Sequence, residues 1–269
     1  MPDQNRRSLA ELVTRYQFHP ELRDLLVEGE RDISVFRWFL SSLPKSRGVV
    51  YHVNSVDLTA EDCESVGVYG GGNKGRVIAL ARILDAELPP RCVSVLCCVD
   101  RDCLDFELPY RSYRYLIHMD FACLECYALG QKSLYKLFIT YLGTQITPGE
   151  IDSMMDVLRY VFSVRLAKRR LAPDAAWFDR FTKCCSLHNG RVRLDKQAYL
   201  SRVLNVADGL LPGESVERET KWFAAQSLAD MRLAVHGHDA VHLLRLVGLL
   251  VQRALGEILL TKPPCTVRC

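Results

Sequence analysis

The chain has little net charge, no uninterrupted apolar run long enough for a membrane span, and no ATP-binding signature. A formal charge of +3 over 269 residues is too small to indicate a nucleic-acid binder by itself. The most apolar late stretch, residues 240–260, is interrupted by charged side chains and His242, which favours an amphipathic or buried helix. The glycine-rich segment 69–75 lacks the Gly-Lys-Ser/Thr ending of a P-loop, so ATP hydrolysis would require another protein.

The N-terminus and the cysteines indicate the compartment. No apolar stretch precedes Leu25, so we expect no secretory leader. The eleven cysteines are odd in number, and Cys97 and Cys98 fall within an apolar segment, which fits thiols in a reducing compartment. We therefore expect a cytoplasmic protein that does not attach to membranes. Cys123 and Cys126 have metal-pair spacing, but no second pair at zinc spacing accompanies them, which argues against a zinc or redox role.

Short apolar segments alternate with helical patterns in the first half of the chain. We predict strands over 24–28, 49–53, 92–99 and 113–118, separated by helices over 9–24, 31–43 and 76–87. This alternation predicts an α/β fold with a mainly parallel four-stranded sheet, covered by helices on both faces. The later pattern is helical, near 121–129, 132–142, 148–171, 174–185, 195–204, 218–235 and 239–260. We therefore predict an α/β domain over 1–130 and an all-helical domain over 131–269.

Two of the predicted strands end at carboxylates. Glu28 follows the first strand, and Asp100 and Asp102 follow the third. Ligands of open α/β sheets bind beyond the carboxyl ends of the strands, so we expect these acids to converge at one edge. Carboxylate oxygens suit Mg²⁺ or Mn²⁺, and paired ions of this kind promote displacement at phosphorus. The pattern predicts a metal site with Glu28, Asp100 and Asp102 as catalytic residues.

Other polar residues are secondary candidates for the same site. Glu125 lies in an expected helix after the fourth strand and is a candidate fourth metal ligand. Asp32 is either a more distant ligand or a first-turn acid that complements the helix dipole, and the second interpretation is favoured. Lys74, Arg76 and Arg101 are candidate contacts to a nucleic-acid backbone, although the glycine-rich segment also fits a simple turn.

The late histidines are better explained by structure than by metal binding. His236, His238 and His242 are not accompanied by a zinc-protease motif, so we expect them to cap or pack. Asp239 is a natural N-cap for the last helix.

The order Val27-Glu28-Gly29, a glycine-rich turn before a helix, and Val99-Asp100-Arg101-Asp102 resembles the TOPRIM fold. Topoisomerases, bacterial primases and overcoming-lysogenization-defect nucleases share that fold, and the resemblance covers roughly residues 20–130. A narrower resemblance, carried by Gly71-Gly72-Asn73-Lys74, residues 120–127 and residues 235–239, is to the AriB family, the TOPRIM effectors of the PARIS anti-phage defence system.

That narrower resemblance implies a toxic, Mg²⁺-dependent nuclease with transfer RNA as the favoured substrate. It also implies an ATPase partner of the AriA kind, which holds the nuclease inactive until infection. The sequence does not distinguish transfer RNA from DNA as the substrate, and it leaves open whether the chain forms a homodimer. Two alternatives remain: a non-catalytic subunit that docks on the ATPase, and a phosphotransferase on a related α/β fold.

Overall fold

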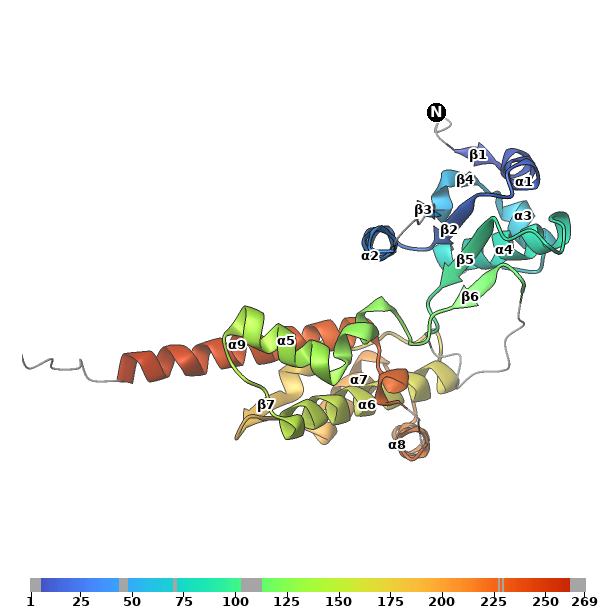
Figure 1. The fold of residues 1–269 in the computed structure, drawn as a ribbon. Coiled ribbons are helices and arrows are strands. Elements are labelled where there is room, and N and C mark those ends of the chain that lie inside the picture. Colours follow the sequence, from blue (N-terminus) through green and yellow to red (C-terminus); the bar gives the residue numbers. More distant parts are fainter. Residues whose placement is uncertain are drawn as a thin grey trace, which may run out of the picture. The chain divides into compact units, whose positions relative to one another are not determined.

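The chain folds as two compact units. The computed structural model describes residues 6–43, 48–69, 72–102, 113–226, 228 and 230–261. Its internal contacts separate Met1–Asp120 from Phe121–Cys269, which we call the first and the second unit (Figure 1). The boundary expected from the sequence, between residues 130 and 131, lies inside the second unit.

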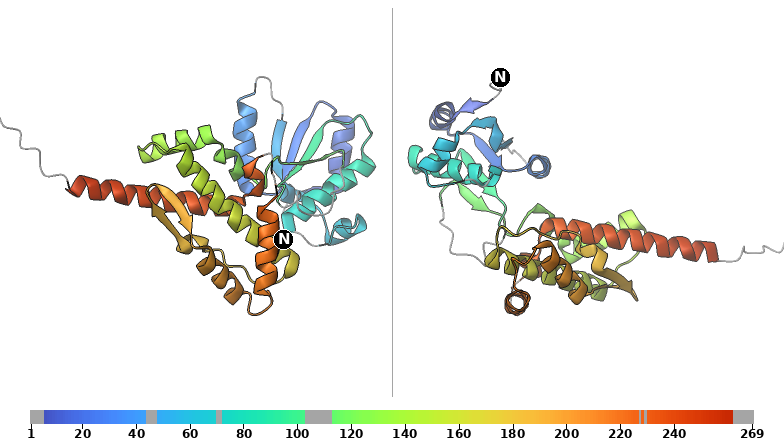
Figure 2. Two further views of the ribbon diagram at one scale, coloured as in Figure 1. Left: turned by 90° about the horizontal axis from the view of Figure 1, so that it is seen from below. Right: turned by 180° about the vertical axis from the view of Figure 1, so that it is seen from behind.

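The first unit is built on a four-stranded parallel sheet with the strand order β3-β2-β5-β6 (Figures 1 and 2). Its strands are β2 (Arg23–Val27), β3 (Gly48–His52), β5 (Val95–Val99) and β6 (Leu116–His118). In β2, one of the two inner strands, Val27 pairs with His52 of β3 on one side and with Cys98 of β5 on the other. The predicted parallel sheet is confirmed, and its parallel strands all end at one edge.

Helices cover the two faces of this sheet unequally. On one face, α1 (Leu9–Phe18) and α4 (Gly72–Glu87) contribute to a core with the inward side chains of β2 and β5, including Leu26, Cys97 and Val99. On the other face, α2 (Glu30–Ser41) shares an apolar groove with Leu25, Leu96 and Ile117. Leu96 and Ile117 remain 40% and 41% exposed. Helices therefore flank both faces of the sheet, as predicted, but α2 covers its face only in part.

Small elements complete the first unit, and the sequence patterns did not predict them. A two-residue parallel pair joins β1 (Arg7–Ser8) to β4 (Val56–Asp57). The chain between β3 and α4 also forms η1 (Val53–Ser55) and α3 (Ala60–Ser65). Reciprocal capping boxes fix the starts of α1, through Ser8 and Glu11, and of α3, through Thr59 and Asp62.

The second unit is mainly helical and is organised around α6. Its helices are α5 (Gln131–Leu142), α6 (Pro148–Leu171), α7 (Lys196–Val206), α8 (Gly213–Ala224) and α9 (Gly237–Thr261), with short turns η3 (Leu124–Leu129), η4 (Phe181–Cys184) and η5 (Met231–Ala234). Thr147 and Glu150 form a capping box at the start of α6. Val161 of α6 packs in one core with Phe138, Tyr199 and Val216 from the neighbouring helices. In the described part of the chain, no helix has both the length and the apolarity that crossing a membrane requires.

A β-hairpin in the second unit contradicts the all-helical prediction. β7 (Cys185–His188) and β8 (Arg191–Leu194) pair antiparallel around Asn189 and Gly190, whose φ angles are +49° and +75°. Asn-Gly is the preferred pair for such two-residue turns, because both positions require a positive φ. The helix predicted over 174–185 is also wrong, because that segment, all of it described, contains no helix beyond the short turn η4, and the one predicted over 218–235 ends at Ala224.

Candidate functional site at the sheet edge

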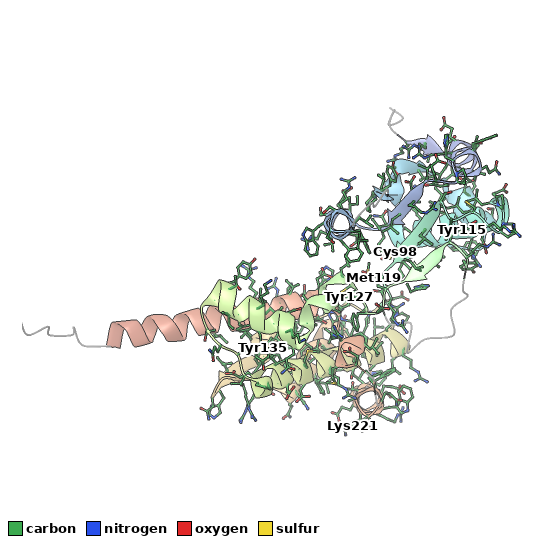
Figure 3. The ribbon with its side chains drawn as sticks, in the orientation of Figure 1. Cys98, Tyr115, Met119, Tyr127, Tyr135 and Lys221 are labelled. Carbon is green, nitrogen blue, oxygen red and sulfur yellow. The ribbon has the colours of Figure 1, made fainter. Side chains whose placement is uncertain are left out.

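Glu28, Asp100 and Asp102 all lie at the carboxyl edge of the sheet in the first unit. Glu28 directly follows β2 and Asp100 directly follows β5, two strands that pair with each other. Oε1 of Glu28 accepts a hydrogen bond of 2.9 Å from the backbone N–H of Asp100. Cys98, two residues before Asp100, marks this end of β5 (Figure 3). The two strand ends are therefore joined through the carboxylate that the sequence analysis singled out.

Lys74 brings a positive charge into this group of acids. Its ammonium donates to the backbone carbonyl of Asp100 at 2.7 Å and forms an ion pair with the carboxylate of Asp102. Lys74 lies in the first turn of α4, which begins at Gly72. The sequence pattern predicted a helix start at residue 76 with Lys74 in the preceding loop, so that boundary is wrong. Gly70 and Gly71 lie outside the described residues.

Burial and mutual repulsion change the acidity of the two central carboxyls. Burial raises the pKa of Asp100 to about 8, and the negative charges of Glu28, Asp32 and Asp102 act in the same direction. Burial also raises the pKa of Glu28, against the lowering effects of the Asp100 N–H and of Lys74. Near neutral pH the group therefore holds a proton at Asp100 in part of the molecules. An added cation would compete with that proton.

Asp32 acts as a helix cap. Its Oδ2 accepts a hydrogen bond of 2.9 Å from the backbone N–H of Gly29, the residue before α2. This matches the favoured interpretation of a first-turn acid at a helix start. Its charge still contributes to the raised pKa values of Glu28 and Asp100, so Asp32 influences the site without leaving its cap.

Three further polar residues at this edge were not among the site residues predicted from the sequence. Asn73 donates to the backbone carbonyl of Glu28 at 2.9 Å, and its Nδ2 lies 3.4 Å from Nε2 of His52, the last residue of β3. His118 is the last residue of β6, and burial lowers its pKa, as do the charges of Lys74 and Arg101. Each of the four strands therefore places a polar residue at its carboxyl end. Two of these are single histidines, for which no spacing pattern exists.

The remaining site candidates have other neighbours. Arg76 donates to the backbone carbonyls of Leu58 and Val56 at 2.8 and 3.2 Å, so its side chain holds the segment that precedes α3. Arg101 lies between the two aspartates in sequence and influences His118 electrostatically. Glu125 belongs to the second unit, where it lies in η3 beside Gly237, the first residue of α9.

The histidine segment of the second unit has a packing role. Asp239 is not the N-cap of α9, because the helix already begins at Gly237. Its buried carboxylate instead accepts two-pronged hydrogen bonds at 2.9 Å from Arg165 of α6, and the Arg165 guanidinium lies 4.5 Å from the Trp177 ring centre. The rings of His236 and His238 stack with centres 5.3 Å apart.

The acids at the sheet edge suit a divalent cation in charge, but they do not form a ready-made cage. Oδ1 of Asp100 is buried and has no hydrogen-bond partner within the described residues, which leaves one oxygen available to a cation. Across the same residues, no three acidic, histidine or cysteine side chains are arranged as a metal site. The Lys74 ammonium already occupies two acceptors at this edge, the Asp100 carbonyl and the Asp102 carboxylate.

Comparison with protein families and with curated proteins found no relative of the chain. No protein-family model and no curated protein matches the chain.

Proposed function

We propose that the chain is a nuclease dependent on Mg²⁺ or Mn²⁺ that cleaves phosphodiester bonds, with transfer RNA as the favoured substrate. One observation carries the proposal. The Glu28 carboxylate binds the backbone of Asp100, while Asp100 keeps a buried oxygen without a partner beside a lysine ammonium. Acidic oxygens from two non-adjacent chain segments, gathered beside a cation, are what phosphoryl transfer requires.

Each residue has a chemical role in this proposal. A bound divalent ion stabilises charge on the attacking and leaving oxygens. Glu28, Asp100 and Asp102 are the residues that would hold it. Lys74, once its ammonium leaves Asp102, would neutralise a non-bridging phosphate oxygen. The proton that Asp100 carries near neutral pH would be released as the metal binds.

The biological setting of the proposal rests on the resemblance to the AriB family. The order of the elements supports it, because a glutamate ends one central strand, an Asp-Arg-Asp segment ends its neighbour, and α4 supplies a lysine between them in sequence. We propose a cytoplasmic toxic effector of anti-phage defence, kept inactive by an ATPase partner. A homodimer remains compatible with this role.

Nuclease assays with isosteric variants test the proposal. Purified wild-type protein should cleave labelled transfer RNA with Mg²⁺ or Mn²⁺ and stop cleaving in EDTA. Glu28→Gln and Asp100→Asn should each lower the rate by about 100-fold or more, because they remove a negative charge without changing size. Asp57→Asn alters an exposed acid of β4 and serves as the matched control. Equal, metal-independent cleavage by all four proteins would rule the site out.

One observation favours a second candidate, a non-catalytic subunit that docks on the ATPase. Lys74 already compensates the acidic group without a metal ion, so these residues can serve as a structural ion-pair cluster. On that reading, Lys74→Met would destabilise the protein, and no protein in the series would cleave nucleic acid. Copurification with the ATPase, combined with absent cleavage under every metal condition, would favour this candidate over the nuclease.

A further inference from the structure

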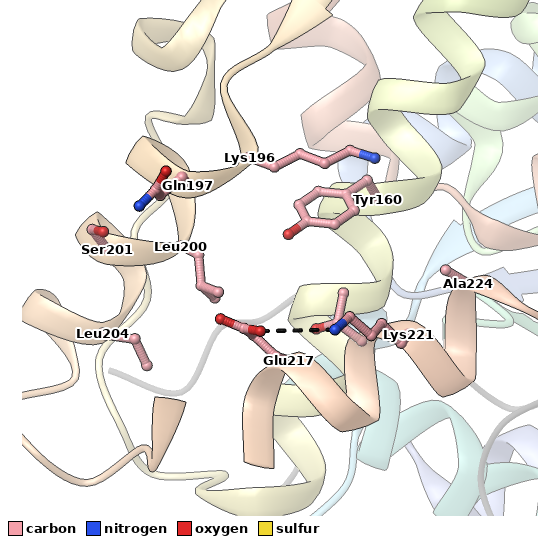
Figure 4. A pocket seen from close by; sticks show the side chains of 10 residues that line it. Tyr160, Lys196, Gln197, Leu200, Ser201, Leu204, Glu217, Lys221 and Ala224 are labelled. Atoms are coloured by element: carbon pink, nitrogen blue, oxygen red, sulfur yellow. Dashed lines mark ion pairs between the residues drawn. The ribbon is translucent and has the colours of Figure 1, made fainter. Parts of the chain in front are cut away.

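The second unit contains a pocket formed by α6, α7 and α8 that the proposed nuclease site does not use (Figure 4). Its volume is about 600 Å³, within the range of small-molecule sites. Leu200 and Leu204 of α7 and Ala224 of α8 provide apolar walls. The pocket can therefore accept a flat, partly apolar group such as a nucleobase.

Charged and polar side chains from α6 and α8 also line this pocket. Glu217 and Lys221 lie one turn apart on α8, and their carboxylate and ammonium are 3.9 Å from each other. Both side chains are largely exposed, so the pair is loose and both charged groups remain available to a ligand. The Tyr160 hydroxyl points toward the space between Leu200 and Glu217 (Figure 4). Burial and the charge of Glu217 raise the pKa of Tyr160, which keeps this hydroxyl protonated as a donor.

Thr220 contributes a buried side chain to the wall of this pocket. It lines the same pocket and is only 3% exposed. Its Oγ1 is buried and has no hydrogen-bond partner among the described residues. A buried hydroxyl without a partner is uncommon in folded proteins.

We propose that this pocket binds a guanine nucleotide. The pairing edge of guanine presents one acceptor, O6, followed by two adjacent donors, N1–H and the 2-amino group. The Lys221 ammonium donates, and the neighbouring Glu217 carboxylate accepts two hydrogen bonds, so the pair is complementary to that edge. Adenine, cytosine and uracil each lack the two adjacent donors that a carboxylate can accept together.

Lys196 supplies the charge for the phosphate. Its ammonium lies 4.7 Å from the centre of the Tyr160 ring, at the rim of the pocket. In the described part of the chain this ammonium forms no ion pair with a carboxylate, so an anionic phosphate gains a partner there. The site requires none of the acids at the sheet edge, so it stands without the proposed nuclease activity.

Calorimetric titration of the full-length protein in EDTA tests the proposal, since no cleavage occurs without metal. The probes are GMP, inosine monophosphate, AMP and guanosine. GMP should bind, and loss of the 2-amino group in inosine monophosphate should weaken binding about tenfold. Guanosine should bind more weakly than GMP in the wild type but equally in Lys196→Met. Glu217→Gln should lose about tenfold in GMP affinity. The control Glu214→Gln, an exposed acid on α8 outside the pocket, should change nothing.

The same nucleotide chemistry can come from free nucleotide or from RNA. Short single-stranded RNAs that differ only in a central guanine or adenine distinguish the two sources. Binding of the guanine RNA about tenfold tighter than GMP identifies RNA as the ligand, and weaker binding identifies free nucleotide. Equal affinity for GMP and AMP, an unchanged affinity in Glu217→Gln, or no binding of any probe would overturn the proposal.

Discussion

The raised pKa of Asp100 predicts that the first unit loses stability as the pH rises. A carboxyl whose pKa is higher in the folded state binds its proton more tightly there than in the unfolded chain. The free energy of unfolding therefore falls between the ordinary value of 3.8 and the folded value of about 8. Asp100→Asn removes this titration and should flatten that part of the pH dependence.

The magnitude follows from the size of the shift. Each pH unit between those two values carries about 1.4 kcal/mol, which gives about 4 kcal/mol between pH 5 and pH 8 as an upper limit. Asp100 is only partly buried and lies near Lys74, so water and that ammonium screen the penalty. We expect about half of the limit, or about 2 kcal/mol.

Hydrogen exchange across a urea series measures this effect in the first unit alone. The amides of β2 and β5 report its unfolding at pH 5 and at pH 8 in metal-free buffer. Wild-type protein should lose about 2 kcal/mol more than Asp100→Asn across that range, while Asp57→Asn should follow the wild type. Identical pH dependence in wild type and Asp100→Asn would refute the reasoning.

Two further predictions concern the second unit, and urea unfolding measures both. Asp239→Ala leaves the Arg165 guanidinium without its buried partner and should cost about 3 kcal/mol. Glu219→Ala breaks the more exposed pair with Arg170 and should cost less than about 1 kcal/mol, so equal losses would contradict the role given to burial. Gly190→Ala should cost at least about 1 kcal/mol, because its φ is +75° and the new methyl would lie 2.1 Å from Oε1 of Glu150. The control Gly209→Ala has a similar φ but no atom within 4 Å of the methyl, so a larger loss there would exclude the clash.

The parallel sheet and the acids at its edge could be predicted because their signals are local. An apolar segment that stops at a carboxylate, as at Val27-Glu28 and Val99-Asp100, indicates both a buried strand and its polar end. The carboxyl ends of parallel strands then share an edge whatever the remaining fold. Strand order needed the structure, since it depends on which strands pair across long separations in the chain.

The missed features had weak or misleading signals. Gly72-Asn73 favours a turn, so the first turn of α4 and the position of Lys74 were assigned to a loop. There the contacts of Asn73 and Lys74 with the two strand ends override the local preference. The hairpin is different, because Asn189-Gly190 is a strong turn signal, but residues 186–188 include no β-branched residue and no strand was predicted there.

The packing of α4 in the core determines where Lys74 lies relative to the acids at the strand ends. Ala79 and Ala81 are completely buried and belong to the core that α4 shares with β2 and β5. Lys74 lies in the first turn of the same helix. A bulkier side chain in this core, up to two turns from Lys74, would displace α4. The ammonium would then move away from its carbonyl and carboxylate acceptors, and the acids at the strand ends would repel one another more strongly.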